Sequence, residues 1–336
     1  MASARAQKIY LGRRGWGLTL VVLIVLASTC ASFASPLFLH VDQLLNSTGA
    51  MVVSGVLALG LAPIVLVGEI DISLTSNLAF CTVVLGLLSE AHVNPALIVL
   101  ATLVTGLALG AFNGALVGYG GLPSLAVTLG TLGSYQGAAY LVGGTTSFTT
   151  FPGPIYAIGA NSVGPVPISL LVFAAVAIAL TVLFRLTTIG RSLYAVGRAS
   201  EAVRHSGISV AFVKMVTFCI GGVIAGLAAL IFVGQYGSGG GDSASGTILT
   251  VVTAVALGGL DIYGGAGRIS SLVLAIVLLD VIQNGMGLVN SSTTSQTIVI
   301  GLVLILSLLV PEMVGRLRGE RSFGRRGLLQ ALRFSR

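Results

Sequence analysis

The sequence predicts an all-α polytopic membrane protein with about ten transmembrane helices, some of them short or broken. Of the 336 residues, 55% are hydrophobic and 8% are charged, whereas soluble domains carry about 25% charged residues. No Lys or Arg occurs between Arg14 and Arg185. The 46 glycines have no collagen period, and membrane helices use glycine to pack closely. These observations exclude a soluble globular enzyme.

Ten apolar runs approach the length of about 20 residues that crosses a bilayer as a helix. The first run follows a basic segment but is nearly long enough to span, so we expect an uncleaved helix rather than a signal peptide. The predicted spans are Gly17–Leu39, Thr48–Val67, Ile72–Ser89, Pro95–Val117, Pro123–Val142, Ile168–Phe184, Val213–Val233, Gly246–Gly259, Ser270–Leu288 and Thr294–Val310.

The distribution of basic residues predicts the topology. If the N-terminus is cytoplasmic, the segments 185–214, 261–268 and 316–336 follow an even number of crossings and are cytoplasmic too. All 17 Lys and Arg residues then lie on one side of the membrane, as the positive-inside rule requires. We therefore expect a cytoplasmic basic N-terminus (1–16), a transmembrane domain (17–315) and a cytoplasmic basic tail (316–336).

Two longer polar segments interrupt the spans. The outer loop 143–167 is rich in Gly, Pro, Ser and Thr, and it is either a surface for a partner or substrate or a plain connector. The cytoplasmic segment 187–214 carries apolar residues at Leu193, Tyr194 and Val196, and then at Ala202 and Val203. This spacing suits one or two short amphipathic helices. A simple basic anchor is the alternative interpretation.

No catalytic constellation is present in the sequence. The three histidines and three cysteines have no metal-ligand spacing, and no GxxxxGK[ST] phosphate loop occurs. We therefore expect no enzymatic activity, no metal and no cofactor bound by this chain, and no nucleic-acid partner. A role in transport, anchoring or sensing remains.

Ionisable residues near the bilayer are the strongest functional candidates, because they are costly unless protein or water satisfies them. Glu69 and Asp71 lie between two apolar runs, which favours a broken helix lining a cavity over a tight turn that caps a helix. In the broken helix, Ser73 or Thr75 would cap the following segment. Asp280 lies within a span, and Gln283 and Asn284 extend it into a polar stripe, as in a transport pathway or an interhelical contact.

Two short segments of the sequence are weakly similar to one another, as in transporters built from two duplicated halves. The residues 68–72 (GEIDI) are similar to the residues 258–262 (GGLDI). Asn113-Gly114 precedes Gly130 by the spacing that separates Asn284-Gly285 from Gly301. The two echoes are separated by different gaps, so chance similarity is the alternative.

Five motifs in order resemble the inner-membrane permease subunits of bacterial ABC importers for ribose, other simple sugars and autoinducer-2. The resemblance covers about residues 45–312. This chain has Arg198-Ala199 where the family usually has Gly-Asn, and Thr75-Ser76 near a position where the family often has glycine. The matching motifs are Gly68-Glu69-Ile70-Asp71-Ile72-Ser73 (the family's G-G-I-D-L-S), Gly121-Leu122-Pro123-Ser124 with Thr128-Leu129-Gly130-Thr131, Gly190-Arg191-Ser192-Leu193-Tyr194-Ala195-Val196-Gly197, Glu201-Ala202 with Ser206-Gly207-Ile208, and Leu257-Gly258-Gly259 with Gly264-Gly265-Ala266-Gly267.

The resemblance implies a multi-pass permease in the bacterial cytoplasmic membrane, surrounded by lipid and paired with a second permease subunit. It also implies two ATPase subunits that bind ATP and magnesium, and an extracytoplasmic binding protein that delivers a small neutral sugar. The segment 187–214 resembles the coupling segment that docks on the ATPase. Its candidate coupling residues are Gly190, Arg191, Tyr194, Gly197, Glu201, Ala202 and Gly207.

The candidate residues of the translocation path are Glu69, Asp71, Ser73, Asn113, Thr128, Asp280 and Asn284. An ion-coupled secondary transporter is the alternative function, with Glu69, Asp71 or Asp280 as the coupling carboxylate. Dependence of transport on an ATPase would distinguish the two.

Overall fold

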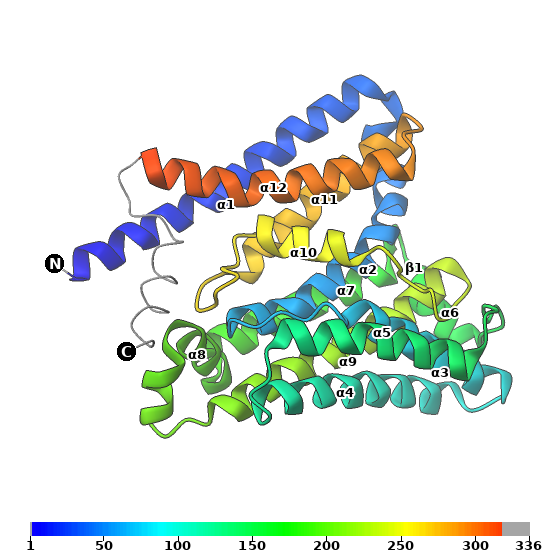
Figure 1. Cartoon of the computed structure of the whole chain (residues 1–336). Helices are drawn as coiled ribbons and strands as arrows, with labels where there is room; N and C mark the ends of the chain where they lie inside the picture. Colours follow the sequence, from blue (N-terminus) through cyan, green and yellow to red (C-terminus); the bar gives the residue numbers. More distant parts are fainter. Residues whose placement is uncertain (1, 318–336) are drawn as a thin grey trace.

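The structure is a computed structural model that describes residues 2–317. Within this range the side chains of residues 2–15, 37, 41–48, 50, 308 and 310–317 are not described. The described chain is a bundle of helices, with one short antiparallel hairpin that pairs Ser162 with Pro167 and Val163 with Val166 (Figure 1). Among the described residues, five helices are long and apolar enough to cross a membrane. The protein is therefore an all-α membrane protein.

The elements follow the order of the predicted spans, with additions at both ends of the bundle. They are α1 (Ala2–Ala34), the 3₁₀ helix η1 (Pro36–Leu39), α2 (Val41–Leu66), α3 (Leu74–Glu90), α4 (Pro95–Gly118), α5 (Ser124–Gly143), α6 (Gly153–Ala160), β1 (Ser162–Val163), β2 (Val166–Pro167), α7 (Ile168–Leu186), α8 (Thr188–His205), α9 (Val210–Tyr236), α10 (Ile248–Leu257), α11 (Ile269–Leu288) and α12 (Thr293–Leu317).

Several predicted boundaries differ from the structure, including the starts of α1 and α2 and the end of α12. Helix α1 starts at Ala2 instead of residue 17, because hydropathy reports membrane depth and not where helical hydrogen bonding begins. Helix α10 has only 10 residues, since the glycine-rich turns before it take up part of the predicted span. The loop 143–167 contains α6 and the hairpin, and α9 already begins inside the segment 187–214.

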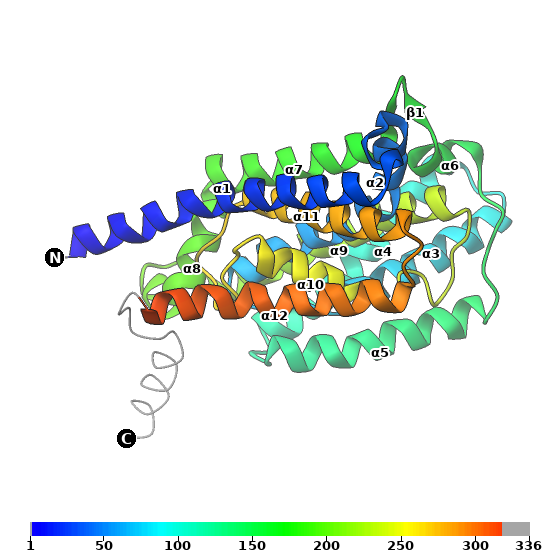
Figure 2. The ribbon, with the colours of Figure 1, turned by 90° about the horizontal axis from the view of Figure 1, so that it is seen from above.

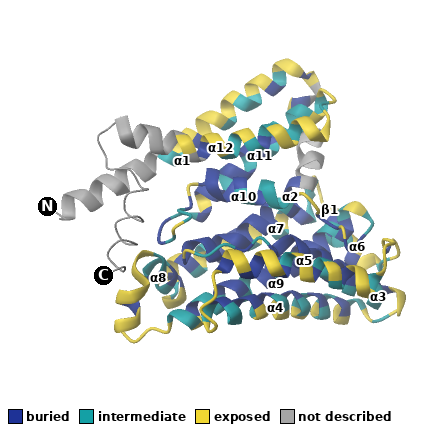
Figure 3. Cartoon of the chain, in the orientation of Figure 1, coloured by how far each residue is buried: buried dark blue, intermediate teal, exposed yellow. Residues whose placement is uncertain are grey.

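Helix α9 forms the centre of the bundle and packs closely on α4. The two backbones approach at glycines: a β-carbon at Gly110 of α4 would lie 3.0 Å from the Cα of Gly222. A β-carbon at Gly226 of α9 would lie 2.9 Å from the Thr102 carbonyl oxygen. Small residues allow such contact between membrane helices, where van der Waals packing replaces the hydrophobic driving force. The buried residues accordingly concentrate in α2, α3 and α9 (Figure 3).

One end of the bundle collects most of the segments singled out by the sequence. Helix α8, the loop between α10 and α11, the first turns of α1 and the last turns of α12 lie at this end (Figures 1 and 2). Helix α6 and the hairpin lie at the opposite end. The predicted tail lies outside the described residues from residue 318 onward, as do the side chains of the basic residues before residue 15.

Candidate functional site: a helix break and its attachment to α8

The predicted break between the second and third spans is present. Helix α2 ends at Leu66 and α3 begins at Leu74. Gly68, with φ of 83°, ends α2 in the left-handed conformation that glycine adopts without strain. Its amide donates to the Val65 carbonyl at 2.9 Å, and the Glu69 amide donates to the Ile64 carbonyl at 3.1 Å. These bonds satisfy carbonyls at the end of the helix.

Asp71 is the polar centre of the break and is 1% exposed. Its Oδ1 accepts the Ser73 amide at 2.8 Å and the Ser73 hydroxyl at 2.6 Å. The carboxylate thus lies at the N-terminal end of α3, where the helix dipole favours negative charge. The predicted cap by Ser73 is wrong, because the Ser73 side chain makes no capping bond to α3 and donates to Asp71 instead.

The Asp71–Ser73 pair continues into a buried hydrogen-bond chain across three helices. Asn113 of α4 donates to the Ser73 Oγ at 2.8 Å. The single hydroxyl proton of Tyr135 in α5 is shared between the Leu109 carbonyl of α4 at 2.9 Å and the Asn113 Oδ1 at 3.1 Å. Sequence reasoning missed Tyr135, which carries no motif signal. The only available indication was that a buried tyrosine hydroxyl needs a polar partner.

The main chain of Ile70 joins the break to the start of α5. Its amide donates to the Ser124 Oγ at 3.2 Å, and the Thr128 hydroxyl donates to its carbonyl at 3.3 Å. Four predicted path residues therefore meet here: Asp71, Ser73, Asn113 and Thr128. Each is at most 1% exposed, so within one chain they form a polar core that fixes the break.

Glu69 is held outside this network by an ion pair. Its Oε1 lies 2.5 Å from the Lys214 Nζ in the first turns of α9, and the two side chains are 14% and 24% exposed. The sequence predicted Glu69 but gave no indication of its partner, which lies 145 positions further along the chain. A carboxylate neutralised in this way is poorly placed to bind a coupling ion.

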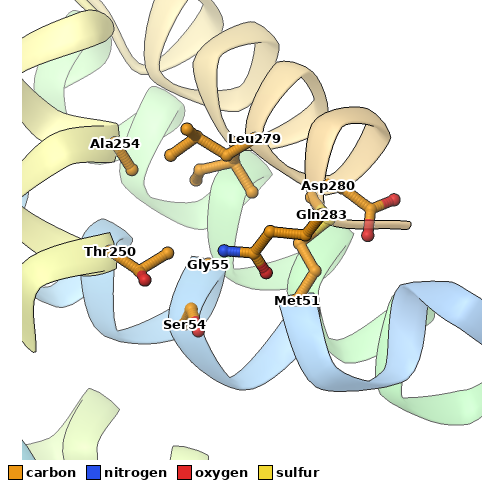
Figure 4. Close-up of a pocket in the computed structure, with 9 residues that line it drawn as sticks. Met51, Ser54, Gly55, Thr250, Ala254, Leu279, Asp280 and Gln283 are labelled. Carbon is orange, nitrogen blue, oxygen red and sulfur yellow. The ribbon is translucent and has the colours of Figure 1, made fainter. Parts of the chain in front are cut away.

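Asp280 and Asn284 lie apart from the Asp71 network, on α11. Asp280 and Gln283 line a small pocket between α2, α10 and α11, together with Ser54 and Thr250 (Figure 4). The Gln283 amide points toward Thr250 and Ser54, whereas the Asp280 carboxylate points away from them. The pocket of about 10 Å³ holds about one water. The structure therefore divides the predicted path candidates between two places.

Helix α8 has two parts separated by a kink at Ala199, where φ is −161° and ψ is 74°. In the first part Leu193 and Val196 are buried, as the predicted amphipathic pattern requires. Thr187 precedes this part, and its Oγ1 accepts the Gly190 amide at 3.1 Å. A β-carbon at Gly190 would overlap the Leu183 carbonyl of α7, so glycine allows α8 to fold back on α7.

The first part of α8 contacts the α10–α11 loop and the end of α2. The Tyr194 hydroxyl donates to the Gly267 carbonyl at 3.0 Å, and the Arg198 Nε donates to the Gly265 carbonyl at 2.9 Å. A β-carbon at Gly197 would overlap both the Leu66 carbonyl and the Gly265 amide. Helix α8, the end of α2 and the α10–α11 loop thus meet in backbone contact.

The second part of α8 and the turn after it project away from the bundle. We call residues 199–209 the arm; all of them are exposed except Val203. Glu201 and Arg204 form an ion pair at 2.7 Å, with side chains 69% and 67% exposed. The predicted coupling residues therefore divide into two groups. Gly190, Arg191, Tyr194 and Gly197 lie in the attached part, and Glu201, Ala202 and Gly207 lie in the arm.

Comparisons with known proteins identify the class. A family model described as the permease component of the branched-chain amino acid transport system matches residues 43–308. The chain is 30% identical over 300 residues to the autoinducer 2 import system permease protein LsrD of Yersinia pseudotuberculosis serotype O:3 (strain YPIII), covering 88% of this chain and 90% of the relative. The LsrD of Yersinia pestis (strain Pestoides F) matches with the same identity and coverage. No solved structure matches.

This chain belongs to the family of membrane permeases of transport systems. The resemblance to ABC importer permeases is confirmed, and the family is one of transport subunits and not of enzymes. The comparisons give no support to an ion-coupled secondary transporter.

Proposed function

We propose that this chain is the permease subunit of an ATP-driven importer for a small neutral sugar. Importers of autoinducer-2 belong to the same class of transporter. Two separate ATPase subunits, a second permease and an extracytoplasmic binding protein complete the transporter, and this chain itself binds no ATP. The observation that carries the proposal is the exposed arm of α8, which is anchored through the attached part of α8 to the α10–α11 loop and the end of α2.

The proposed topology has ten spans, with both termini and the arm in the cytoplasm. In support, each predicted span overlaps a helix of the described chain, and the shortest of these helices is α10 with 10 residues. The basic residues of 185–214 and Arg268 belong to segments at one end of the bundle, as the positive-inside rule favours. The outer loop 143–167, with α6 and the hairpin at the opposite end, is the proposed surface for the binding protein.

The proposed contact with the second permease is the outer face of α5. Gly130, Gly133 and Gly137 lie on this face, where an added β-carbon would meet only open space. Ser134 is exposed beside them. Glycine and hydroxyl groups are unusual toward lipid but common where membrane helices meet. A path along this face would present small and polar groups without charge, which suits a neutral polyol.

The arm provides the direct test. Ala202 is exposed, so Ala202→Asp should leave membrane insertion and folding within about 0.5 kcal/mol of the parent. It should nevertheless abolish uptake and release the ATPase subunits from the purified complex, because a charged, larger side chain blocks close docking. Co-purification of the ATPases with the tagged permease is the measurement, and Ala202→Ser is the matched control. Full uptake with undiminished ATPase retention would overturn the proposal.

A labelling experiment tests the orientation separately. Cysteines are introduced at Ser206 in the arm or at Thr146 in the outer loop, after the native cysteines have been replaced. A membrane-impermeant maleimide should label the Thr146→Cys variant in intact spheroplasts. It should label Ser206→Cys only after the membrane is opened. Labelling of both positions from the same side would contradict the proposed topology.

A further inference from the structure

We propose that Glu69 and Lys214 form a charged strut that carries movement of the α8 arm to the α2–α3 break, and from there to α5. The inference rests on the proposed function, since it assumes that an ATPase moves the arm. It assigns positioning roles to Lys214 and Glu69, and it makes the break the mechanical link between the cytoplasmic arm and the proposed interface helix.

The first step is the ion pair itself. It joins two segments far apart in the sequence, at 2.5 Å and with both side chains mostly buried. Glu201–Arg204, by contrast, is an exposed pair between neighbours on one helix. Exposed pairs contribute little, but loss of one partner from a shielded pair leaves an uncompensated charge and is strongly unfavourable. The Glu69–Lys214 pair can therefore resist separation when the segments that carry it are pulled apart.

The second step connects Lys214 to the arm. The arm ends at Ser209, whose Oγ accepts the Phe212 amide at 3.3 Å and so caps α9. Lys214 lies in the following turn of the same helix. Displacement of the arm therefore acts on the helix that carries the cationic end of the strut, without an intervening flexible linker.

The third step connects Glu69 to α5. The next residue, Ile70, is hydrogen-bonded through its amide to Ser124 and through its carbonyl to Thr128, both in the first turns of α5. One residue further on, the hydrogen-bond chain from Asp71 through Ser73 and Asn113 reaches Tyr135 in the same helix. Force applied at Glu69 thus reaches α5 through two independent sets of hydrogen bonds.

The sequence supports a role specific to this chain. The G-G-I-D-L-S motif that residues 68–73 resemble has glycine at the position of Glu69, so this chain has a carboxylate where the motif has no side chain. A large, charged residue at a shielded position is retained at a cost unless it is paired. The ion pair with Lys214 compensates for the burial of the Glu69 charge. Because Lys214 lies on α9, directly after the arm, the same ion pair connects Glu69 to the arm.

The test measures movement at both ends of the strut in the complete complex with its ATPases in lipid nanodiscs. Spin labels are placed at Ser206 in the arm and at Ser134 in α5, each paired with a reference label at Leu302 of α12, in a chain without native cysteines. Distances are compared without nucleotide and after trapping with ATP and vanadate. The parent should show a change for both pairs.

In Glu69→Gln and in Lys214→Met, the arm should still respond to ATP and vanadate. The fraction of molecules in which α5 responds should fall about tenfold, the size of a typical coupling between two sites. The exchange Glu69→Lys with Lys214→Glu should restore the α5 response in large part, and Lys214→Arg should preserve it. Glu90→Gln removes an exposed acid at the opposite end of α3 and is the matched control.

An unchanged α5 response in both single variants would overturn the strut. Failure of the charge exchange to restore the response in a complex that elutes as a single species would overturn it too. If the arm of the parent complex does not respond to ATP and vanadate, the proposed function itself fails. The two failures are therefore distinguishable.

Discussion

The α2–α3 break and the α10–α11 loop begin in the same way and end differently. Each follows a helix that ends at a left-handed glycine, Gly68 or Gly259. In each, the glycine amide donates to the carbonyl of the residue three positions earlier. The amide of the next residue donates to the carbonyl five positions earlier. An aspartate follows, Asp71 or Asp261, whose Oδ1 accepts the amide two residues later at 2.8 Å or 3.0 Å. The two helix ends are therefore alike, but they are shifted by one residue relative to the sequence similarity, which aligns Gly68 with Gly258.

The two loops differ in what surrounds the aspartate. Asp71 is buried and continues through Ser73 into α4 and α5, whereas Asp261 is half-exposed and bonds locally. The break turns back into the bundle, while the α10–α11 loop faces α8 and supplies carbonyls to Tyr194 and Arg198. Similar turns thus make different contacts: the break is hydrogen-bonded to α5, and the α10–α11 loop is hydrogen-bonded to α8.

The two loops should differ most in how much stability the protein loses when their aspartates are replaced. Asp71→Leu removes the acceptor of two buried donors and should cost about 1–3 kcal/mol for each, seen as a lower melting temperature and poor expression. Asp71→Asn keeps an acceptor oxygen and should lose much less. Asp261→Leu should stay within about 0.5 kcal/mol, because the site is partly open to solvent. Equal loss of folding in both Asp71 variants would contradict the role of Asp71 as the hydrogen-bond acceptor of Ser73.

The point where both loops meet α8 should give the next largest effect. In Gly197→Ala, the new methyl group overlaps the backbone of both loops, so we expect a destabilisation of about 1–3 kcal/mol from overpacking. ATP hydrolysis and transport should also become uncoupled. The matched control is Gly287→Ala on α11, where an added β-carbon meets nothing within 4 Å. Thermal unfolding and the ratio of solute transported to ATP hydrolysed are the measurements, and a Gly197→Ala protein equal to the control would break the proposed junction.

The smallest difference is expected at the two helix-ending glycines. Gly68→Ala and Gly259→Ala each force alanine into the left-handed region, with φ of 83° and 70°, at a cost of about 1–2 kcal/mol. The two variants should lower the melting temperature by similar amounts, since the local hydrogen bonding is the same. A large difference between them would show that the two turns are not equivalent and would weaken the duplication.

Much of the site followed from residue types. The break at Glu69 and Asp71 and the amphipathic α8 were predicted. Ser73, Asn113 and Thr128 were predicted as path residues; they meet at the break, and their part in translocation stays a prediction. Tyr135 and Lys214 were missed, because each looks like an ordinary residue near the end or middle of an apolar helix until its partner is known. Asp280 was grouped with Asp71 because both are acids in apolar surroundings, and only the packing of α11 separates them.

By itself, the sequence determined that this is a helical membrane protein, where most helices lie and which permease family it joins. Composition and charge placement decide the class and the helix positions, because the bilayer excludes unpaired polar groups over lengths that can be counted along the chain. The family is indicated by the five motifs and not by composition. Only the tertiary structure decided which polar groups meet. Whether a carboxylate is an isolated charge, a helix cap or half of an ion pair depends on contacts between segments separated by many residues, such as Glu69 with Lys214, and local patterns carry no record of those contacts.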